Sequence, residues 1–359
     1  MTAAVRPIRL LIVDDSAYNR RNIADLFTGY SEVEVVGKAA DGEEALRLAT
    51  LLKPDVITLD LEMPRMDGFT FLRILMSKQP TPVIVVSSYS QKENVFKALE
   101  LGALDFVTKP NQQISPDATE VKDQILQKVL LVRSLRPTFP APPASRRQVS
   151  GAWTADGRPA SEGRIAVSYA APKLLVAIGS STGGPSALLE IFGRLPAASP
   201  AAVVVAQHMP DKFTRTFAER LDRRGAFRTS EAQDGDLVAR ATGFVCPGRQ
   251  CMEVSSTGAE VKVAVAAPGA GDRYVPSADR LLKSAARAFG PKSVGVVLTG
   301  MGDDGTEGAR AIRDAGGIVV AESQDTAVVY GMPGSVVRAG LASKVLKLPE
   351  IAEYLAALG

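Results

Sequence analysis

Residues 1–135 alternate between two patterns of hydrophobic positions. Runs of apolar, mostly branched side chains are typical of strands buried on both faces, and they are separated by stretches with the periodicity of amphipathic helices. Strands are expected at residues 10–13, 33–37, 56–59, 83–86 and 106–108. Helices are expected at residues 17–27, 42–51, 69–77 and 94–101. Strand alternating with helix predicts a doubly wound α/β domain around a parallel sheet.

The same alternation returns over residues 173–359. Strands are expected at residues 174–178, 202–206, 294–298 and 318–321, and helices at residues 185–193, 213–224, 278–289 and 306–315. Between residues 242 and 265 the pattern changes to short alternating segments, which predicts an antiparallel hairpin appended to the sheet. The second half is therefore expected to be another doubly wound, Rossmann-like domain with a parallel sheet.

Residues 136–172 separate the two halves and have a different composition. They contain six Pro, eight Ala, four Ser and three Gly, with little periodic apolar pattern. Such a Pro/Ala-rich stretch favours an extended linker. We therefore expect domains at 1–135 and 173–359, joined by a linker at 136–172, as suits a chain of 359 residues. Trp153, the single tryptophan, lies in this linker, and the sequence gives it no role.

Composition narrows the class of protein. A net charge of +3, with no Lys/Arg cluster interleaved with aromatic residues, argues against a nucleic-acid partner. No apolar run reaches the roughly 18 residues that a membrane span needs, and the N-terminus lacks the apolar core of a signal peptide. Cys246 and Cys251 do not have zinc-site spacing and are expected to be reduced thiols. We therefore expect a cytoplasmic protein without membrane insertion.

Polar residues follow four of the five expected strands in the first half. Asp14 and Asp15 follow the first strand, Asp60 the third, Ser87 the fourth and Lys109 the fifth. Each acid alone is most often a helix cap or a turn residue. Together, three carboxylates at one sheet edge repel one another and favour Mg²⁺. Asp60 is then the best phosphoryl acceptor, with the metal and Lys109 neutralising charge and Ser87 donating a hydrogen bond.

With these residues and the segment LDLEMPRMDG at 59–68, residues 8–135 resemble a two-component receiver domain. The resemblance implies a flavodoxin-like fold and phosphorylation of Asp60 by a histidine kinase. It also implies Mg²⁺ ligation by Asp15, Asp60 and the Glu62 carbonyl, with Asp14 in support. Ser87, Phe106 and Lys109 would be the switch residues, and the bond from Lys109 to Pro110 is often cis in this family.

The turn GSSTGG at 179–184 joins an apolar strand to a helix that opens with Pro185. Gly179, Ser181 and Gly183 have the spacing of a nucleophile elbow, in which a serine is held at a sharp strand-to-helix turn. A phosphate cradle at a helix N-terminus has similar composition. The turn alone leaves these two alternatives open.

Three strand ends in the second half carry the residue types of an acyl-transfer site. They bring Ser181, the only histidine, His208, and the acid pair Asp303 and Asp304. A serine needs a base to lose its proton, and that base needs a carboxylate to orient it. The Gly-rich turns also bring backbone N–H groups at Thr182 and near Met301 that suit an oxyanion hole. The chain order Ser, His, Asp differs from that of α/β-hydrolases.

Residues 173–359 resemble the catalytic domain of the chemotaxis-specific protein-glutamate methylesterases. The likeness rests on GSSTGG at 179–184, QHMP at 207–210, FTRTFAERL at 213–221, PSAD at 276–279, LTGMGDDG at 298–305 and GMP at 331–333. It implies Ser181 as nucleophile, His208 as base, Asp304 as orienting carboxylate, and Thr182 and Met301 as oxyanion donors. The family usually has Ala at the position of Ser180 and often Asn at that of Asp303.

The resemblance also implies an activity and its regulation. The expected enzyme hydrolyses glutamate γ-methyl esters and deamidates glutamines on chemoreceptors, needs no cofactor for the esterase reaction, and is inhibited by its unphosphorylated receiver. We expect a monomer. One alternative is a regulator whose second half only binds a partner. Another is a nucleotide-binding enzyme, but the turn lacks a following Lys and an acid about 20 residues on.

Overall fold

The computed structural model describes residues 6–88, 92–109, 117–135, 170–258 and 260–358. The chain divides into two compact units, Met1–Ala144 and Ser145–Gly359. Most of the expected linker, with Trp153, lies outside the described residues, and so does Pro110. Among the helices in these ranges, none has the length together with the apolar character that a membrane span requires.

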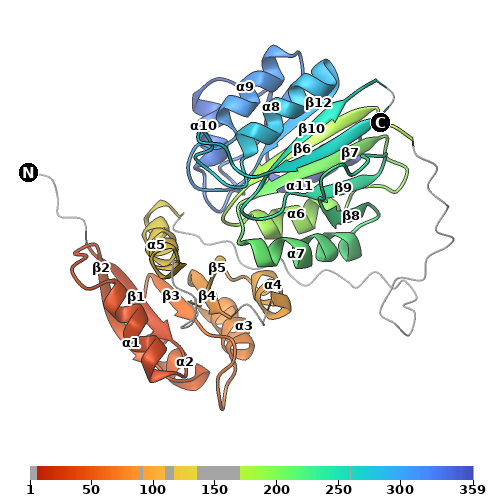
Figure 1. The fold of residues 1–359 in the computed structure, drawn as a ribbon. Helices are drawn as coiled ribbons and strands as arrows, with labels where there is room; N and C mark the ends of the chain where they lie inside the picture. Colours follow the sequence, from red (N-terminus) through yellow and green to blue (C-terminus); the bar gives the residue numbers. More distant parts are fainter. Residues whose placement is uncertain (1–5, 89–91, 110–116, 136–169, 259, 359) are drawn as a thin grey trace, which may run out of the picture. The chain divides into compact units, whose positions relative to one another are not determined.

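The first unit is built on a five-stranded parallel sheet (Figure 1). Its strands are β1 (Ile8–Val13), β2 (Val33–Ala39), β3 (Val56–Leu59), β4 (Val83–Ser87) and β5 (Asp105–Thr108). Their spatial order β2-β1-β3-β4-β5 is that of flavodoxin-like folds. All five strands expected from the apolar runs are confirmed, and the three central ones are buried along nearly their whole length.

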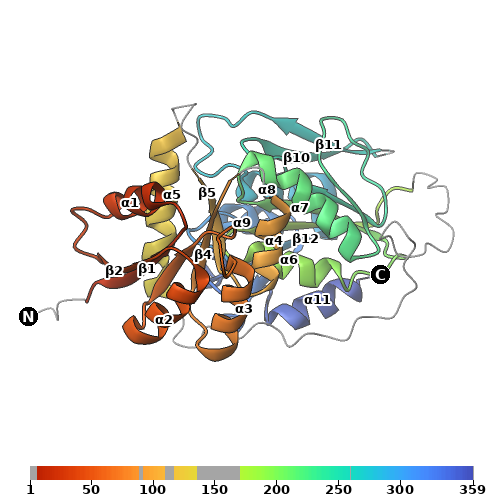
Figure 2. The ribbon, with the colours of Figure 1, turned by 90° about the horizontal axis from the view of Figure 1, so that it is seen from below.

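Helices cover both faces of this sheet, with α1 and α5 on one side and α2 and α3 on the other (Figure 2). Side chains of Ser16, Asp41 and Asp67 cap α1, α2 and α3 by accepting backbone N–H groups. The helix α5 had not been expected. The helices are α1 (Ala17–Leu26), α2 (Gly42–Leu52), α3 (Gly68–Lys78), α4 (Lys92–Glu100), α5 (Asp117–Leu130) and the short 3₁₀ segment η2 (Leu131–Ser134).

The second unit contains a seven-stranded parallel sheet in the order β14-β13-β12-β6-β7-β9-β8. The central strands β12, β6 and β7 are almost entirely buried, as their apolar runs predict. The strands are β6 (Leu174–Ser180), β7 (Ala201–Gln207), β8 (Arg228–Glu231), β9 (Thr242–Val245), β12 (Ser293–Val297), β13 (Ile318–Glu322) and β14 (Lys344–Leu346).

Two groups of helices enclose this sheet. The helices α8, α9 and α10 lie over one face, and α6, α7 and α11 lie over the other (Figure 1). This two-sided cover explains why the central strands carry apolar side chains in both directions. The helices are α6 (Gly184–Phe192), α7 (Asp211–Arg224), α8 (Ala278–Phe289), the short 3₁₀ segment η3 (Gly290–Lys292), α9 (Thr306–Asp314), α10 (Met332–Arg338) and α11 (Leu348–Ala356).

The hairpin expected between residues 242 and 265 is confirmed only in its second part. β10 (Cys251–Ser256) and β11 (Val261–Ala266) pair antiparallel, but they form a separate two-stranded sheet rather than an extension of the main one. The expectation was wrong for residues 242–245, because β9 pairs in parallel with β7 and β8. A strand of four residues is too short for its periodicity to distinguish the two kinds of pairing.

Candidate active site and acidic pocket

The turn after β6 holds its two serines in different surroundings. Ser180, the last residue of the strand, is fully buried, and its hydroxyl donates to Gln207 Oε1 at 2.6 Å. Gly183 has a φ of 81° at the N-cap of α6, where a side chain would strain the turn. Ser181 is partly buried, and within the described ranges its hydroxyl makes no hydrogen bond. Of the two serines, Ser181 is therefore the one available for chemistry.

His208 follows the neighbouring strand β7 and is tied to the serine turn. Its backbone N–H donates to the carbonyl of Ser180 at 3.0 Å. Its ring Nε2 lies 2.8 Å from Asp304 Oδ2, and its side chain is 17% exposed. An ionised carboxylate only accepts hydrogen bonds, so this contact places the ring proton on Nε2. The lone pair of a neutral His208 is then on Nδ1.

Asp304 is buried against the start of α8. Backbone N–H groups of Ala278, Asp279 and Gly305 donate to its carboxylate at 2.7, 2.9 and 3.0 Å. Two of these groups belong to the first turn of α8, where the helix dipole stabilises an anion. With the ring of His208 as a further donor, the carboxylate is held in one orientation and in turn orients the imidazole.

The adjacent acid, Asp303, has other partners. Tyr274 donates its hydroxyl to Asp303 Oδ1 at 3.0 Å, and Arg273 Nη1 lies 3.4 Å from Oδ2. The side chain of Asp303 is 50% exposed. Of the two neighbouring acids, only Asp304 is therefore hydrogen-bonded to His208.

The three candidate catalytic residues lie at the carboxyl ends of adjacent strands. β6 lies between β12 and β7, so the turn with Ser181 is flanked by the loop with Asp304 and the residue His208. The Ser181 N–H donates to the carbonyl of Thr299, which follows β12, at 3.0 Å. Both side chains belong to the described part of the chain, and no hydrogen bond joins the Ser181 hydroxyl to the His208 ring. Hydrogen bonds between catalytic residues are often long or absent before the substrate binds.

The two candidate oxyanion donors differ in exposure. Met301 is 46% exposed, and its N–H has no hydrogen-bond partner in the part of the chain that the structure describes. Thr182 is buried, and its carbonyl accepts a hydrogen bond from Thr299 Oγ1 at 2.9 Å. Met301 therefore offers a backbone donor at the surface of the site.

Sequence reasoning missed a hydrogen-bonded centre behind the serine turn. Thr299 contacts the turn through its carbonyl and its hydroxyl, and its own N–H donates to Glu322 Oε2 at 2.8 Å. Glu322 is fully buried at the end of β13, and its other oxygen, Oε1, has no partner among the described residues. Burial raises the pKa of Glu322 to about 7. The sequence signal that could have indicated this buried acid is the position of Glu322 directly after the apolar run of β13.

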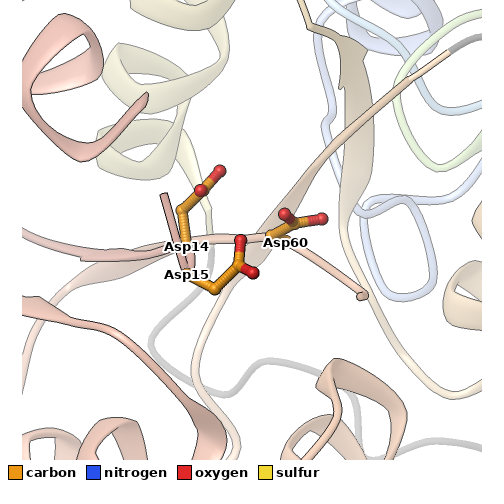
Figure 3. Close-up of side chains that lie close together, drawn as sticks. All are labelled: Asp14, Asp15 and Asp60. Atoms are coloured by element: carbon orange, nitrogen blue, oxygen red, sulfur yellow. The ribbon is translucent and has the colours of Figure 1, made fainter. Parts of the chain in front are cut away.

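The acidic pocket of the first unit brings together residues from three strand ends. Carboxylate oxygens of Asp14, Asp15 and Asp60 lie within 4.8 Å of one another (Figure 3). Asp14 and Asp60 are buried, whereas Asp15 is exposed. Lys109 Nζ lies 2.5 Å from Asp60 Oδ2 and 3.0 Å from Asp14 Oδ2. The sequence-based expectation that these residues meet at one sheet edge is thus confirmed.

The electrostatics of this pocket suit a divalent cation. Burial raises the pKa of Asp60, and the nearby carboxylate of Asp14 adds to the rise, while Lys109 opposes it. Burial opposes the charge of Lys109, but its bonds to Asp60 and Asp14 outweigh this and raise its pKa. Three clustered carboxylates with one ammonium retain excess negative charge, and hard oxygen donors fit Mg²⁺. Glu62 contributes an N–H to Asp60 Oδ1 at 3.4 Å, and its carbonyl stays a predicted ligand.

Ser87 and Phe106, two of the expected switch residues, lie in β4 and β5. Ser87 is fully buried at the end of β4, and its carbonyl accepts the Lys109 N–H at 2.8 Å. Phe106 is buried in β5, and its ring packs edge-on against Phe96 with 6.3 Å between centroids. The switching roles of these residues stay predictions.

Comparison with known proteins gives a separate family match for each of the two units. Residues 10–115 match the model of the response regulator receiver domain, and residues 176–355 match that of the CheB methylesterase. The crystal structure of the Thermotoga maritima CheB methylesterase catalytic domain is 39% identical and has a TM-score of 0.50, covering 52% of this chain and 98% of that chain.

Two curated relatives are similar along nearly their whole length. A Geobacter sulfurreducens protein named protein-glutamate methylesterase/protein-glutamine glutaminase 3 is 46% identical, over 98% of this chain and 97% of its own. A Myxococcus xanthus protein, named protein-glutamate methylesterase/protein-glutamine glutaminase 1, is also 46% identical, with 98% and 97% covered. The chain therefore belongs to the CheB family of methylesterases that carry a response regulator receiver domain.

Proposed function

We propose that this enzyme hydrolyses glutamate γ-methyl esters, and deamidates glutamines, on chemoreceptors by acyl transfer through Ser181, and so mediates chemotactic adaptation. The observation that carries the proposal is the bond of 2.8 Å between His208 Nε2 and Asp304 Oδ2. It orients the only histidine of the chain beside the serine turn. A module that only bound a partner would have no need for this arrangement.

The first half-reaction forms an acyl-enzyme. His208 Nδ1 takes the proton of the Ser181 hydroxyl as Oγ attacks the ester carbon. The N–H groups of Met301 and Thr182 donate to the oxyanion that develops. The Asp304 carboxylate stabilises the imidazolium, which then protonates the leaving methoxide, so that methanol departs.

The second half-reaction consumes one water. His208 Nδ1 takes a proton from the water as it attacks the glutamyl ester of Ser181, and the imidazolium returns that proton to Ser181 Oγ. A receptor glutamine follows the same route, with ammonia leaving in place of methanol. Both substrates end as glutamate, and neither route calls for a cofactor.

Phosphorylation of Asp60 is the proposed regulatory input, with a chemotaxis histidine kinase as phosphodonor. Asp14, Asp15 and Asp60, together with the carbonyl of Glu62, would hold Mg²⁺, which neutralises phosphoryl charge when bound. Lys109 would bind a phosphoryl oxygen. Ser87 and Phe106 would change position on phosphorylation.

We further propose that the unphosphorylated receiver, residues 1–135, inhibits the catalytic domain, residues 173–359, to which the linker at 136–172 joins it. This order of a receiver followed by an esterase supports control of the second by the first. The protein is proposed to act as a cytoplasmic monomer.

The two serines provide the experiment that tests the reaction. Ser181→Ala should lower methanol release from methylated receptor by at least about 10³-fold, because the nucleophile is removed. Ser180→Ala is the matched control and should retain activity within a few-fold. The opposite order, or equal activity of both variants, would contradict the assignment of Ser181. Circular dichroism checks that both variants are folded.

A further inference from the structure

The ring of Tyr274 lies flat against the ring of His208. The two centroids are 5.3 Å apart and the planes differ by 7°. Tyr274 belongs to the segment between β11 and α8, and it is neither the nucleophile, the base nor the orienting acid. Stacked rings at this separation fix the plane of the imidazole, which the single bond to Asp304 leaves free to tilt.

Tyr274 is itself anchored to the loop that carries Asp304. Its hydroxyl donates to Asp303 Oδ1 at 3.0 Å, and the Arg273 guanidinium lies 5.4 Å from the ring centroid. Gly302 has a φ of 90°, and a Cβ at this position would lie 2.5 Å from the Tyr274 hydroxyl oxygen. Glycine is therefore required at 302 for the loop to approach the tyrosine.

We propose that Tyr274 is a positioning residue for His208, which holds the imidazole plane and stabilises the imidazolium formed during acyl transfer. The face of an aromatic ring carries negative electrostatic potential and attracts a cation stacked on it. This interaction is stronger with the imidazolium of the transition state than with the neutral base, so it favours catalysis rather than substrate binding. The inference rests on the proposed role of His208 in catalysis.

The charged groups that contact the imidazole or Tyr274 can be tested separately by substitution. Asp304 contacts Nε2, while the Tyr274 hydroxyl contacts Asp303, which pairs with Arg273. Asp303 and Arg273 have opposite charges and lie 3.4 Å apart, so their fields on His208 largely cancel. Burial raises the pKa of the Tyr274 hydroxyl, so this ring is neutral wherever the enzyme works.

Three variants of the full chain test the proposal. Tyr274→Leu should lower kcat about tenfold with little change in KM, the size expected for one cation–π contact in a partly buried site. Tyr274→Phe retains the ring and should stay within about threefold of wild type. Asp303→Asn tests the anchor and should have an effect no larger than that of Tyr274→Phe. Tyr274→Met replaces the leucine variant if circular dichroism shows the latter to be unfolded.

A measurement independent of turnover uses the single histidine of the chain. Proton NMR titration of His208 should give a lower pKa in Tyr274→Leu than in Tyr274→Phe, because the unstacked imidazolium is less stable. An unchanged or higher pKa in Tyr274→Leu, or an equal loss of kcat in the leucine and phenylalanine variants, would overturn the proposal. Ser181→Ala distinguishes failure of the proposed reaction from failure of the proposed role of Tyr274. If Ser181→Ala stays active, the reaction through Ser181 is rejected. If Ser181→Ala is inactive and Tyr274→Leu has the activity of the wild type, only the role of Tyr274 is rejected.

Discussion

At the scale of single residues, the site depends on which member of a chemically similar pair takes each position. Ser180 and Ser181 are neighbours, yet only Ser180 is fully buried with its hydroxyl bonded to Gln207, whereas Ser181 contacts Gln207 through its backbone carbonyl. Asp303 and Asp304 are neighbours, yet only Asp304 is bonded to His208. Alignment with the family motifs selected Ser181 and Asp304, but residue type alone could not distinguish the two members of either pair. The hydrogen bonds of the folded chain distinguish their surroundings.

Glu322 yields a prediction about stability. Burial raises its pKa to about 7, whereas an unfolded glutamate titrates near 4.5. The native state therefore binds the proton more tightly, and the stabilisation from that proton is present below pH 4.5 and is lost as pH rises to 7. Glu322→Gln keeps an oxygen acceptor for Thr299 and removes the buried charge. It should raise the free energy of unfolding at pH 8 by about 2 to 3 kcal/mol.

Denaturant unfolding at pH 4.5 and at pH 8 checks this prediction. The gain from Glu322→Gln should be present at pH 8 and nearly absent at pH 4.5. Glu219→Gln is a matched control, because the Glu219 side chain is 54% exposed and its charge is solvated. The prediction would be rejected if Glu322→Gln destabilised the protein at pH 8 or if its effect did not depend on pH.

At the scale of elements, the first turn of α8 links stability to the site. Its N-cap, Ser277, accepts the Arg280 N–H at 3.2 Å, and the same turn donates two backbone N–H groups to Asp304. A cap that fixes a helix start also fixes any anion bound there. The helix thus contributes backbone N–H donors to the site, and sequence motifs do not reveal such donors.

Ser277→Ala should destabilise the second unit by about 1 kcal/mol, as loss of a serine cap commonly does. The esterase activity should fall by a few-fold, because the donors to Asp304 become less ordered. Thermal unfolding followed by calorimetry measures the first effect. Ser16→Ala removes the corresponding cap of α1 in the first unit and should leave the esterase unaltered. Equal loss of esterase activity in both variants would argue against the proposed role of α8.

At the scale of the whole molecule, one chain combines an acidic pocket, proposed to be phosphorylated, with a candidate hydrolytic site. The pocket of Asp14, Asp15 and Asp60 lies in the first unit, and the site of His208 and Asp304 lies in the second. The proposed regulation of the second unit by the first is therefore tested by comparing the full chain with the separated catalytic domain.

A fragment of residues 173–359 should be more active than the unphosphorylated full chain, because it lacks the proposed inhibitor. A crystal structure exists of the catalytic domain of the Thermotoga maritima relative without its receiver, which supports the use of such a fragment. A small acyl-phosphate donor with Mg²⁺ should raise the activity of the full chain. Asp60→Asn should abolish this rise while leaving basal activity unchanged.

Chelation provides the control for this experiment. Removing Mg²⁺ should abolish activation of the full chain and leave the activity of the fragment unchanged, because the metal is proposed to act only at Asp60. A fragment less active than the unphosphorylated chain would contradict inhibition by the receiver. Activation of Asp60→Asn by the donor would contradict phosphorylation at that residue.

The sequence by itself determined the layout of the α/β units. The apolar runs of the central strands and the helix caps are local features, so the receiver strands and the four main strands of the second sheet were predicted to within a few residues. The acidic pocket was also predictable, because parallel strands bring their carboxyl ends to one edge. The edge strands β8 and β14 were missed, since their residues are partly exposed and do not form apolar runs.

Only the tertiary structure decided the contacts between residues distant in the sequence. It placed β9 in the parallel sheet, buried Glu322 behind Thr299 and stacked Tyr274 on the imidazole, and it gave the bond between His208 and Asp304, which only the family resemblance had implied. The physical reason is that hydrogen-bond partners and ring contacts depend on which strand ends become neighbours. No local period of hydrophobic residues carries that information.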